Sequence, residues 1–288
     1  MKDIKSNLPF EIRENMNSSL ARILNVLNLF GPERLEIDAD IIAQEFDLSR
    51  TSAYRYIKEL CDAGLIAKRG PGGYALGPRV IELDWMMRKY DPVLSTGRPY
   101  LENLSQITGL TVFVSAFYDS KIINTFILSP NNDLHFSFGR GRPLPLFRGA
   151  QAKVLTSYRS IKKIKELYET QISQDPNNSY TLEEVLKISK TIRKEGYCAT
   201  NNELNIGNIG IAAPIFSDFE GKEVTYSVCV VGSAQQFNLL RQETIIEILL
   251  ETAKNLTQSI INSEQPISHP QEDDLQIKEE DIEHLEHQ

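Results

Sequence analysis

The feature that most restricts the possible fold is a short glycine-rich hairpin that directly follows three helical segments. Residues 65–69 and 74–76 have the character of short strands, and Gly70-Pro71-Gly72-Gly73 between them is a turn sequence. Three helices followed by a two-stranded hairpin is the element order of a winged helix-turn-helix. The order therefore predicts such a domain over residues 17–78.

Each of the three helical segments has its own start or stop signal. Apolar residues recur at helical spacing from residue 20 to residue 30, and a second segment of this kind follows Asp38 and runs to Phe46. The third segment begins after Ser49, whose hydroxyl can cap a helix, and ends at Gly64, where glycine is favoured. These signals fix the order of the helices and place the third one directly before the hairpin.

The third helix has two chemically different faces. Successive residues of a helix turn by about 100°, so the apolar side chains fall on one side and the hydroxyls, phenol and cations on the other. The apolar face is expected to be buried and comprises Ala53, Tyr56, Ile57 and Leu60. The polar face comprises Thr51, Tyr54, Arg55 and Lys58. Such a polar face suits the major groove of DNA, because arginine can bind guanine bidentately and lysine can neutralise phosphate.

Double-stranded operator DNA is therefore the expected partner of this domain. Residues at the start of the third helix can reach phosphate oxygens, and the hairpin can grip the flanking backbone or the minor groove. Any exposed helix can carry such residues, so the interpretation depends on the hairpin and the local charge as well. The set expected to contact DNA is Ser49, Arg50, Thr51, Ser52, Tyr54, Arg55, Lys58, Lys68 and Arg69.

The charge of the chain is unevenly distributed, which removes an apparent objection to a nucleic-acid partner. The formal net charge is −8. Residues 263–288 hold nine acids and one base, so this tail accounts for the whole excess and is predicted to be disordered. Residues 48–79 hold six bases and two acids, a local charge of +4. At the other end, residues 1–16 are expected to form a flexible arm.

The rest of the chain predicts a linker helix and a larger α+β domain. Residues 79–92 suit the linker helix, in which Trp85, Met86 and Met87 pack either on a partner subunit or on their own domain. Residues 93–262 suit a mixed α/β domain with a mostly antiparallel sheet. Its expected strands are 111–117, 121–128, 134–138, 197–204, 209–216 and 223–231, and its expected helices are 93–107, 149–158, 160–170, 182–195 and 239–261.

Several function classes lack their signatures in this chain. No apolar run approaches the ~18 residues that a membrane span needs, and the start lacks a secretion signal, so a cytoplasmic protein is expected. The three cysteines lack metal-ligand spacing, and neither a metal nor a cofactor is expected. Only His135 of the four histidines lies outside the tail, and no catalytic motif is found, so no enzyme is expected. The alternatives are a helix-turn-helix-linked metabolic enzyme and a ligand-independent DNA-binding adaptor with a filled pocket.

Seven stretches spread along the chain have a characteristic order and spacing: 20–24, 46–55, 64–66, 74–77, 145–155, 196–197 and, most specific, 203–214 (E-L-N-I-G-N-I-G-I-A-A-P). In these stretches the chain resembles the IclR (isocitrate lyase regulator) family of transcriptional regulators, over roughly residues 18–261. This resemblance implies a GAF-like C-terminal effector-binding domain, pairing into homodimers or dimers of dimers, and small organic or aromatic acids as effectors that control operator binding. It does not distinguish a repressor from an activator.

The resemblance also implies an effector pocket, although this chain departs from the family near it. Phe147 stands where the family often has histidine, and Arg148 replaces a small residue. Arg148 either pairs with an effector carboxylate or lies in a solvated loop, and Cys229 is either a small pocket or core residue or a redox sensor. The residues expected to bind the effector are Leu146, Arg148, Thr200, Asn208, Gly210 and Cys229.

Overall fold

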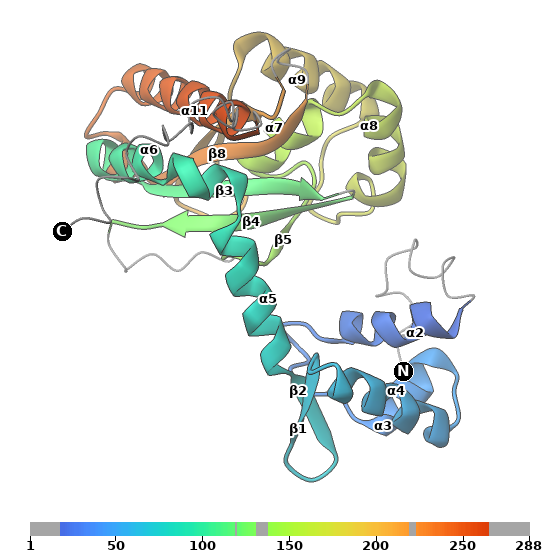
Figure 1. The fold of residues 1–288 in the computed structure, drawn as a ribbon. Helices are drawn as coiled ribbons and strands as arrows, with labels where there is room; N and C mark the ends of the chain where they lie inside the picture. The colour runs from blue at the N-terminus through green and yellow to red at the C-terminus, as the bar shows by residue number, and fades with distance from the viewer. Residues whose placement is uncertain (1–17, 119, 131–137, 219–222, 265–288) are drawn as a thin grey trace, which may run out of the picture. The chain divides into compact units, whose positions relative to one another are not determined.

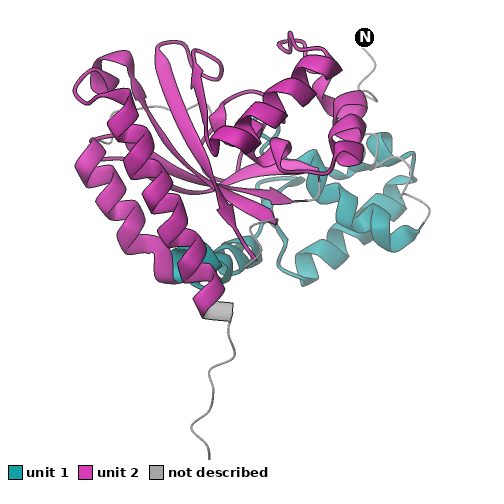
Figure 2. Ribbon diagram, turned by 90° about the horizontal axis from the view of Figure 1, so that it is seen from above, with its two compact units in different colours: residues 1–95 teal, residues 96–288 magenta. Residues whose placement is uncertain are grey.

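The computed structural model describes residues 18–118, 120–130, 138–218 and 223–264. The chain divides into two compact units, Met1–Ser95 and Thr96–Gln288, which are coloured separately in Figure 2. The predicted arm at 1–16, residues 134–137 of the predicted strand at 134–138 and all but the first two residues of the predicted tail lie outside the described residues, and Phe138 is not in a strand.

The first unit contains the predicted order of three helices and a hairpin (Figure 1). The two strands pair antiparallel, with Ile66 opposite Leu76 and Arg69 opposite Gly73. One detail differs from the expectation, because the first helix tightens into a 3-10 turn after Asn25 instead of continuing to Phe30. The elements are α2 (Ser19–Asn25), η2 (Val26–Leu29), α3 (Ala39–Phe46), α4 (Arg50–Asp62), β1 (Ile66–Arg69) and β2 (Gly73–Leu76).

Local capping sets the boundaries of α3 and α4. The side chain of Asp38 accepts a hydrogen bond from the backbone N–H of Ile41, and that of Ser49 accepts one from Ser52. After α4, Gly64 adopts a left-handed φ of 69°, as expected for the residue that follows a helix. Apolar residues of all three helices and of β1 form one core, so the hairpin is held against the end of α4.

Helix α5 (Pro78–Lys89) follows the hairpin and has no buried residue. Trp85 is 58% exposed and Met87 59% exposed, while Met86 is half-buried. The interpretation that Trp85 and both methionines pack on their own domain is therefore wrong for Trp85 and Met87. Arg88 pairs with Asp84 one turn earlier along the helix.

The second unit is built on a six-stranded antiparallel sheet with the order β5-β4-β3-β8-β7-β6. The three central strands are buried on both faces, because helices cover each side. Figure 2 shows α6 and α11 on one face of the sheet and α7 with its neighbours on the other. The strands are β3 (Thr111–Tyr118), β4 (Lys121–Leu128), β5 (Pro143–Leu144), β6 (Cys198–Asn201), β7 (Asn208–Phe216) and β8 (Val224–Ser233).

The helices of this unit agree with the predicted segments, with three differences. The segment expected at 160–170 divides into α8 and a π turn, the last helix begins at Gln242 and not near residue 239, and the short α10 has no counterpart in the prediction. A capping box joins Thr181 and Glu184 at the start of the helix predicted at 182–195. The helical elements are α6 (Pro92–Thr108), α7 (Ala150–Ser157), α8 (Ile161–Leu167), η3 (Tyr168–Ile172), α9 (Leu182–Glu195), α10 (Ala234–Phe237) and α11 (Gln242–Glu264).

Candidate DNA-reading face and effector cleft

The two faces of α4 are sorted as its sequence predicts. Ala53, Tyr56, Ile57 and Leu60 are each at most 3% exposed and pack into the core of the first unit. Thr51, Tyr54, Arg55 and Lys58 are exposed. The hydroxyls, the phenol and two cations therefore form one continuous polar stripe on a rigid helix, which we call the reading face.

The beginning of α4 is already engaged in contacts within the unit. The Ser49 hydroxyl caps the helix and also lies 3.0 Å from the Ser52 hydroxyl. Arg50 pairs with Asp40 at 3.1 Å, and its guanidinium lies 5.9 Å from the centre of the Tyr54 ring. Both members of the ion pair are about two-thirds exposed, so solvent weakens it and a phosphate can compete for Arg50.

The hairpin contributes two further exposed cations, Lys68 and Arg69. Arg69 pairs with Glu36 at 3.6 Å, across an open cleft of about 560 Å³ between the hairpin and the start of α4. Among the described residues, no carboxylate lies within ion-pair distance of Arg55, Lys58 or Lys68. Arg55, Lys58 and Lys68 thus have no ion pair with a described carboxylate, whereas Arg50 and Arg69, beside the cleft at the hairpin, are weakly paired.

The second unit has a cleft where the start of α7 meets β6 and β7. Thr200, Asn208 and Gly210 line it, as the resemblance implied. Its cavity is about 40 Å³, enough for a few water molecules and far below the ~300 Å³ of a typical ligand pocket. The other lining residues are Phe113, Asn124, Phe138, Leu144, Gly149, Ala150, Gln151, Glu203, Leu204, Asn205, Ile209 and Val231.

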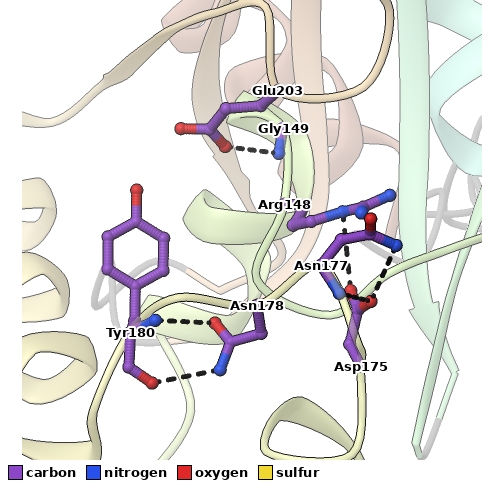
Figure 3. A network of polar contacts seen from close by, with 7 residues as sticks. All are labelled: Arg148, Gly149, Asp175, Asn177, Asn178, Tyr180 and Glu203. Carbon is purple, nitrogen blue, oxygen red and sulfur yellow. Dashed lines mark hydrogen bonds and ion pairs between the residues drawn. The ribbon is translucent and has the colours of Figure 1, made fainter.

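The start of α7 is held by an acidic side chain from the turn after β6. The Glu203 carboxylate accepts a hydrogen bond from the backbone N–H of Gly149 at 2.9 Å, and Figure 3 shows the two groups facing each other. Lys153, one turn further along α7, donates to the same carboxylate at 2.5 Å and to the Tyr180 hydroxyl at 3.0 Å. Lys153 is only 4% exposed and the Glu203 side chain is 23% exposed, so the ion pair is buried at its lysine end and partly solvated at its carboxylate end.

These partners change the titration of the buried lysine. Burial alone pulls the pKa of Lys153 down, but the hydrogen bonds to Glu203 and Tyr180 and their charges outweigh it and raise that pKa above its ordinary value. The ammonium also lies 4.6 Å from the centre of the Tyr180 ring and 5.7 Å from that of Phe147. Lys153 is therefore charged at neutral pH and fully surrounded.

The floor of the cleft is a neutral network of amides. Asn124 accepts from the Ser115 hydroxyl at 2.6 Å and from the Gln151 amide at 3.4 Å, and donates to the Phe138 carbonyl at 2.7 Å. By contrast, no hydrogen bond joins the side chains of Thr200 or Asn208 to any other described residue. The cleft thus offers free polar groups at its mouth and satisfied ones at its floor.

Three of the residues expected to bind the effector do not line this cleft. Leu146 is buried and borders a separate cavity of about 210 Å³ on the other side of the segment that leads into α7. Arg148 borders the same cavity, and its Nε lies 3.5 Å from Asp175 (Figure 3). Cys229 is fully buried in β8, beneath Phe113 and α7. None of the three can touch a ligand in the cleft without a rearrangement.

The state of the cysteines bears on the redox-sensor interpretation. Burial raises the pKa of Cys198 to about 12 and that of Cys229 well above its ordinary value. Both thiols are therefore protonated near neutral pH, whereas a reactive cysteine needs thiolate character. In the part of the chain that the structure describes, no group of His, Cys, Asp and Glu side chains is arranged to hold a metal ion.

Four residues at or beside this cleft were missed by sequence reasoning: Asn124, Gln151, Lys153 and Glu203. Glu203 begins the most specific family-like stretch, and Lys153 lies in the stretch 145–155, which also carries the departures at Phe147 and Arg148. Lys153 and Glu203 are ionisable residues beside apolar or glycine-rich sequence, and their opposite charges are the signal that could have linked them. Their separation of 50 residues hides that pairing.

Family models match both units of the chain. The model described as "Bacterial transcriptional regulator IclR C-terminal" matches residues 89–258, and a helix-turn-helix model, "HTH domain", matches residues 22–75. The two matches together cover the described part of the chain almost from end to end.

Curated relatives are similar over most of their length. The HTH-type transcriptional regulator KdgR of Escherichia coli is 24% identical over 82% of this chain and 88% of its own. The p-hydroxybenzoate hydroxylase transcriptional activator of Acinetobacter baylyi is 22% identical over 88% of this chain and 94% of its own.

Solved structures have the same fold. An IclR-type regulator from Silicibacter sp. TM1040 superimposes with a TM-score of 0.72 at 21% identity, covering 85% of this chain and 96% of its own. An IclR homologue from Microbacterium hydrocarbonoxydans, solved in complex with 4-hydroxybenzoate, gives a TM-score of 0.70 at 21% identity, covering 85% of this chain and all of its own.

The described helices include none with the length and apolarity to cross a membrane.

Proposed function

Because the chain belongs to the IclR family of bacterial transcriptional regulators, we propose that its reading face binds operator DNA and that the cleft beside α7 binds a small organic acid. A chain of this family is a DNA-binding regulator under small-molecule control. Operator binding is assigned to the residues of the reading face and effector binding to the residues of the cleft. We place regulation, not catalysis, in the cleft, and we expect the protein to act in the cytoplasm, where bacterial DNA lies.

The reading face supports the first assignment. Thr51, Tyr54 and Arg55 project from one side of α4 and can reach base edges in the major groove, while Lys58 and Lys68 neutralise phosphates. Arg50, Arg69 and the hydroxyls of Ser49 and Ser52 complete the surface. Arg50 and Arg69 first have to leave Asp40 and Glu36, at small cost because both ion pairs are solvent-exposed.

The exposed helix α5 supports assembly into a homodimer or a dimer of dimers. Ile81, Trp85 and Met87 are between 58% and 74% exposed on a helix that buries no residue of its own. Apolar side chains of this size gain free energy when a second copy covers them. A two-fold dimer would present two reading faces to half-sites about one helical turn, ~34 Å, apart or a multiple of that distance.

The start of α7 carries the second assignment. This helix has no side-chain cap, so the first backbone N–H groups, those of Ala150 and Gln151, lack a partner within the helix, and both residues line the cleft. Such a helix start favours an anionic group. A relative regulates p-hydroxybenzoate hydroxylase and a solved relative holds 4-hydroxybenzoate, which makes aromatic acids the first class to test.

The DNA assignment is tested by selecting genomic fragments on the purified protein. Wild-type protein should enrich fragments that share a two-fold symmetric site, and the Arg55→Ala/Lys58→Ala variant should not. The control is Lys162→Ala/Lys165→Ala, which removes two exposed cations from α8 in the other unit and should enrich the same fragments. Equal enrichment by all three proteins would remove the reading face from consideration.

The effector assignment is tested on the operator complex with matched ligands. We expect a carboxylic acid such as 4-hydroxybenzoate to change operator affinity by about 5- to 150-fold, the usual range of allosteric coupling. Its neutral analogue 4-hydroxybenzamide should have no effect. If no acid in a broad panel changes operator affinity, the ligand-independent adaptor becomes the better description.

A further inference from the structure

Glu203 is the only charged side chain among the residues that line the effector cleft, and it is turned inward. Its two carboxylate oxygens have separate partners: one accepts from the Gly149 N–H and the other from the Lys153 ammonium. One donor belongs to the backbone at the start of a helix, and the other is a buried cation. Two converging donors of this kind form a carboxylate-binding position.

The Lys153 ammonium cannot be left without an anion. It is buried, its second hydrogen bond goes to the neutral Tyr180 hydroxyl, and Glu203 is the only described carboxylate within ion-pair distance of it. Removing one partner of a buried ion pair is strongly destabilising, whereas exchanging one carboxylate for another preserves the pairing. Whatever displaces Glu203 therefore has to bring a negative charge of its own.

Release of Glu203 would also enlarge the cleft. Glu203 belongs to the turn of residues 202–207 between β6 and β7, and the next two residues, Leu204 and Asn205, line the cleft as well. Leu204 packs so closely on Gly149 that a Cβ there would overlap its side chain. The turn is closed on itself by a hydrogen bond from the Gly207 N–H to the Asn202 side chain at 2.5 Å. Glu203 and Leu204 would therefore move together.

We infer that Glu203 is a resident substitute for the effector's carboxylate: an incoming acid takes over the Gly149 N–H and the Lys153 ammonium, and the turn of residues 202–207 moves away from α7. The inference rests on the proposed function in taking this cleft as the effector site. It explains how a cleft of about 40 Å³ with no unpaired cation can receive an acid, because both the charge and the space are supplied by the side chain that leaves. A neutral ligand that displaced Glu203 would leave the Lys153 ammonium without an anion, so neutral compounds are not expected to bind at this position.

The test is to replace the resident carboxylate with one from solution. Glu203→Ala should lower the Tm of the full chain, and acetate should restore it by about 3–6 °C at saturation, while acetamide of the same size should not. Wild-type protein should respond to acetate at least tenfold more weakly, because Glu203 competes for the position. Glu247→Ala, which removes an exposed carboxylate on α11, is the matched control and should behave as wild type.

A second readout follows the buried lysine directly. Lys153 should resist acetylation by an N-hydroxysuccinimide ester in wild-type protein, react in Glu203→Ala, and be protected again by acetate but not by acetamide. If Glu203→Ala does not fold, Glu203→Gln retains the shape without the charge and serves in both measurements. Equal responses to acetate and acetamide, or a Lys153 that stays protected without Glu203, would overturn the inference.

Neither readout involves DNA, so the inference and the proposed function can fail separately. Acetate rescue without any effect of acids on operator affinity would support the carboxylate position and count against effector control through it. Control of operator affinity by an acid that gives no rescue in Glu203→Ala would count against Glu203 while leaving the proposed function intact.

Discussion

The two functional regions of this protein hold their cations in opposite ways. On the reading face, Arg55 and Lys58 are exposed and Arg50 shares a solvated ion pair with Asp40. Beside the cleft, Lys153 is 4% exposed and makes hydrogen bonds to Glu203 and Tyr180. One region keeps positive charge available, and the other keeps it satisfied.

The difference follows from what each partner can offer. Exposed ion pairs contribute about 0–1 kcal/mol, so DNA phosphates can replace Asp40 or Glu36 with little loss. Breaking a buried pair costs about 3–5 kcal/mol, so the cleft can change partner only by exchange. A surface that binds a polyanion can keep its cations unpaired, whereas a buried site that binds one small anion needs another carboxylate in its place until that anion binds.

The largest effect should come from the junction of the hairpin and α4, on which the reading face depends. A Cβ at Gly77 would overlap the backbone of Gly64 and crowd that of Ile66. Gly77→Ala should therefore destabilise the first unit by about 3 kcal/mol and lower its Tm by more than ~12 °C, with at least tenfold weaker operator binding. Gly31→Ala, where a Cβ meets nothing within 4 Å, is the control in the same unit. Similar losses for the two variants would mean that packing at this junction is not what holds the hairpin.

The cleft is best probed through Lys153. Lys153→Met should destabilise the second unit by about 2 kcal/mol near neutral pH, because the partly solvated Glu203 loses its counter-ion. Because folding raises the pKa of Lys153, its ion pair stabilises the folded state fully below the ordinary pKa of 10.5. This stabilisation is lost as the pH rises through the higher pKa of the folded state. Denaturant titrations should show the two proteins converging above pH 10.5. A difference that stays constant into that range would contradict the role given to the ion pair.

The reading face is best probed by comparing two arginines of α4. Arg55→Ala should weaken operator binding by about 1–3 kcal/mol and reduce the slope of log K against log salt by about one unit or less. Arg50→Ala should cost less, because Arg50 gives up Asp40 when it binds DNA. Asp40→Asn should instead tighten binding slightly. Fluorescence anisotropy with labelled operator DNA at several salt concentrations measures all three, and a larger loss for Arg50→Ala would reverse the ranking.

The smallest effect concerns the thiols. Burial raises the pKa of Cys198 to about 12, and Cys229 is fully buried, so neither should react with iodoacetamide at pH 8 in the folded protein. Cys61 is half-buried on α4 and should react first. Peptide mass spectrometry after timed labelling gives the order. Fast labelling of Cys229 would revive the redox-sensor interpretation.

The two regions also differ in how far the sequence predicts them. The faces of α4 depend on one helix, so periodicity identifies both the buried Ala53 and the exposed Arg55. The cleft depends on contacts between distant segments: Glu203 reaches Gly149 across 54 residues, and no local pattern indicates that pairing. Arg148 illustrates the same limit, because the sequence marks it as unusual but cannot show that Asp175 pairs with it.

Secondary structure was missed where elements are too short to have a period. The two-residue strand β5 is set by its neighbour β4, whereas the four-residue helix α10 begins with a capping box of Ser233 and Gln236 that was overlooked in the sequence. The change from α-helix to 3-10 turn at Val26 is likewise a matter of packing, since Val26 and Leu29 are buried in the core of the first unit.

Helix α5 gives this protein an optical property that none of its other elements supplies. Its Trp85 is the single tryptophan of the chain and is 58% exposed. A half-solvated indole emits at longer wavelength than one enclosed by apolar side chains, so the emission spectrum reports the surroundings of one helix alone. In the proposed homodimer, where a second copy covers α5, dilution of the unlabelled protein should move the emission maximum to longer wavelength as the subunits dissociate.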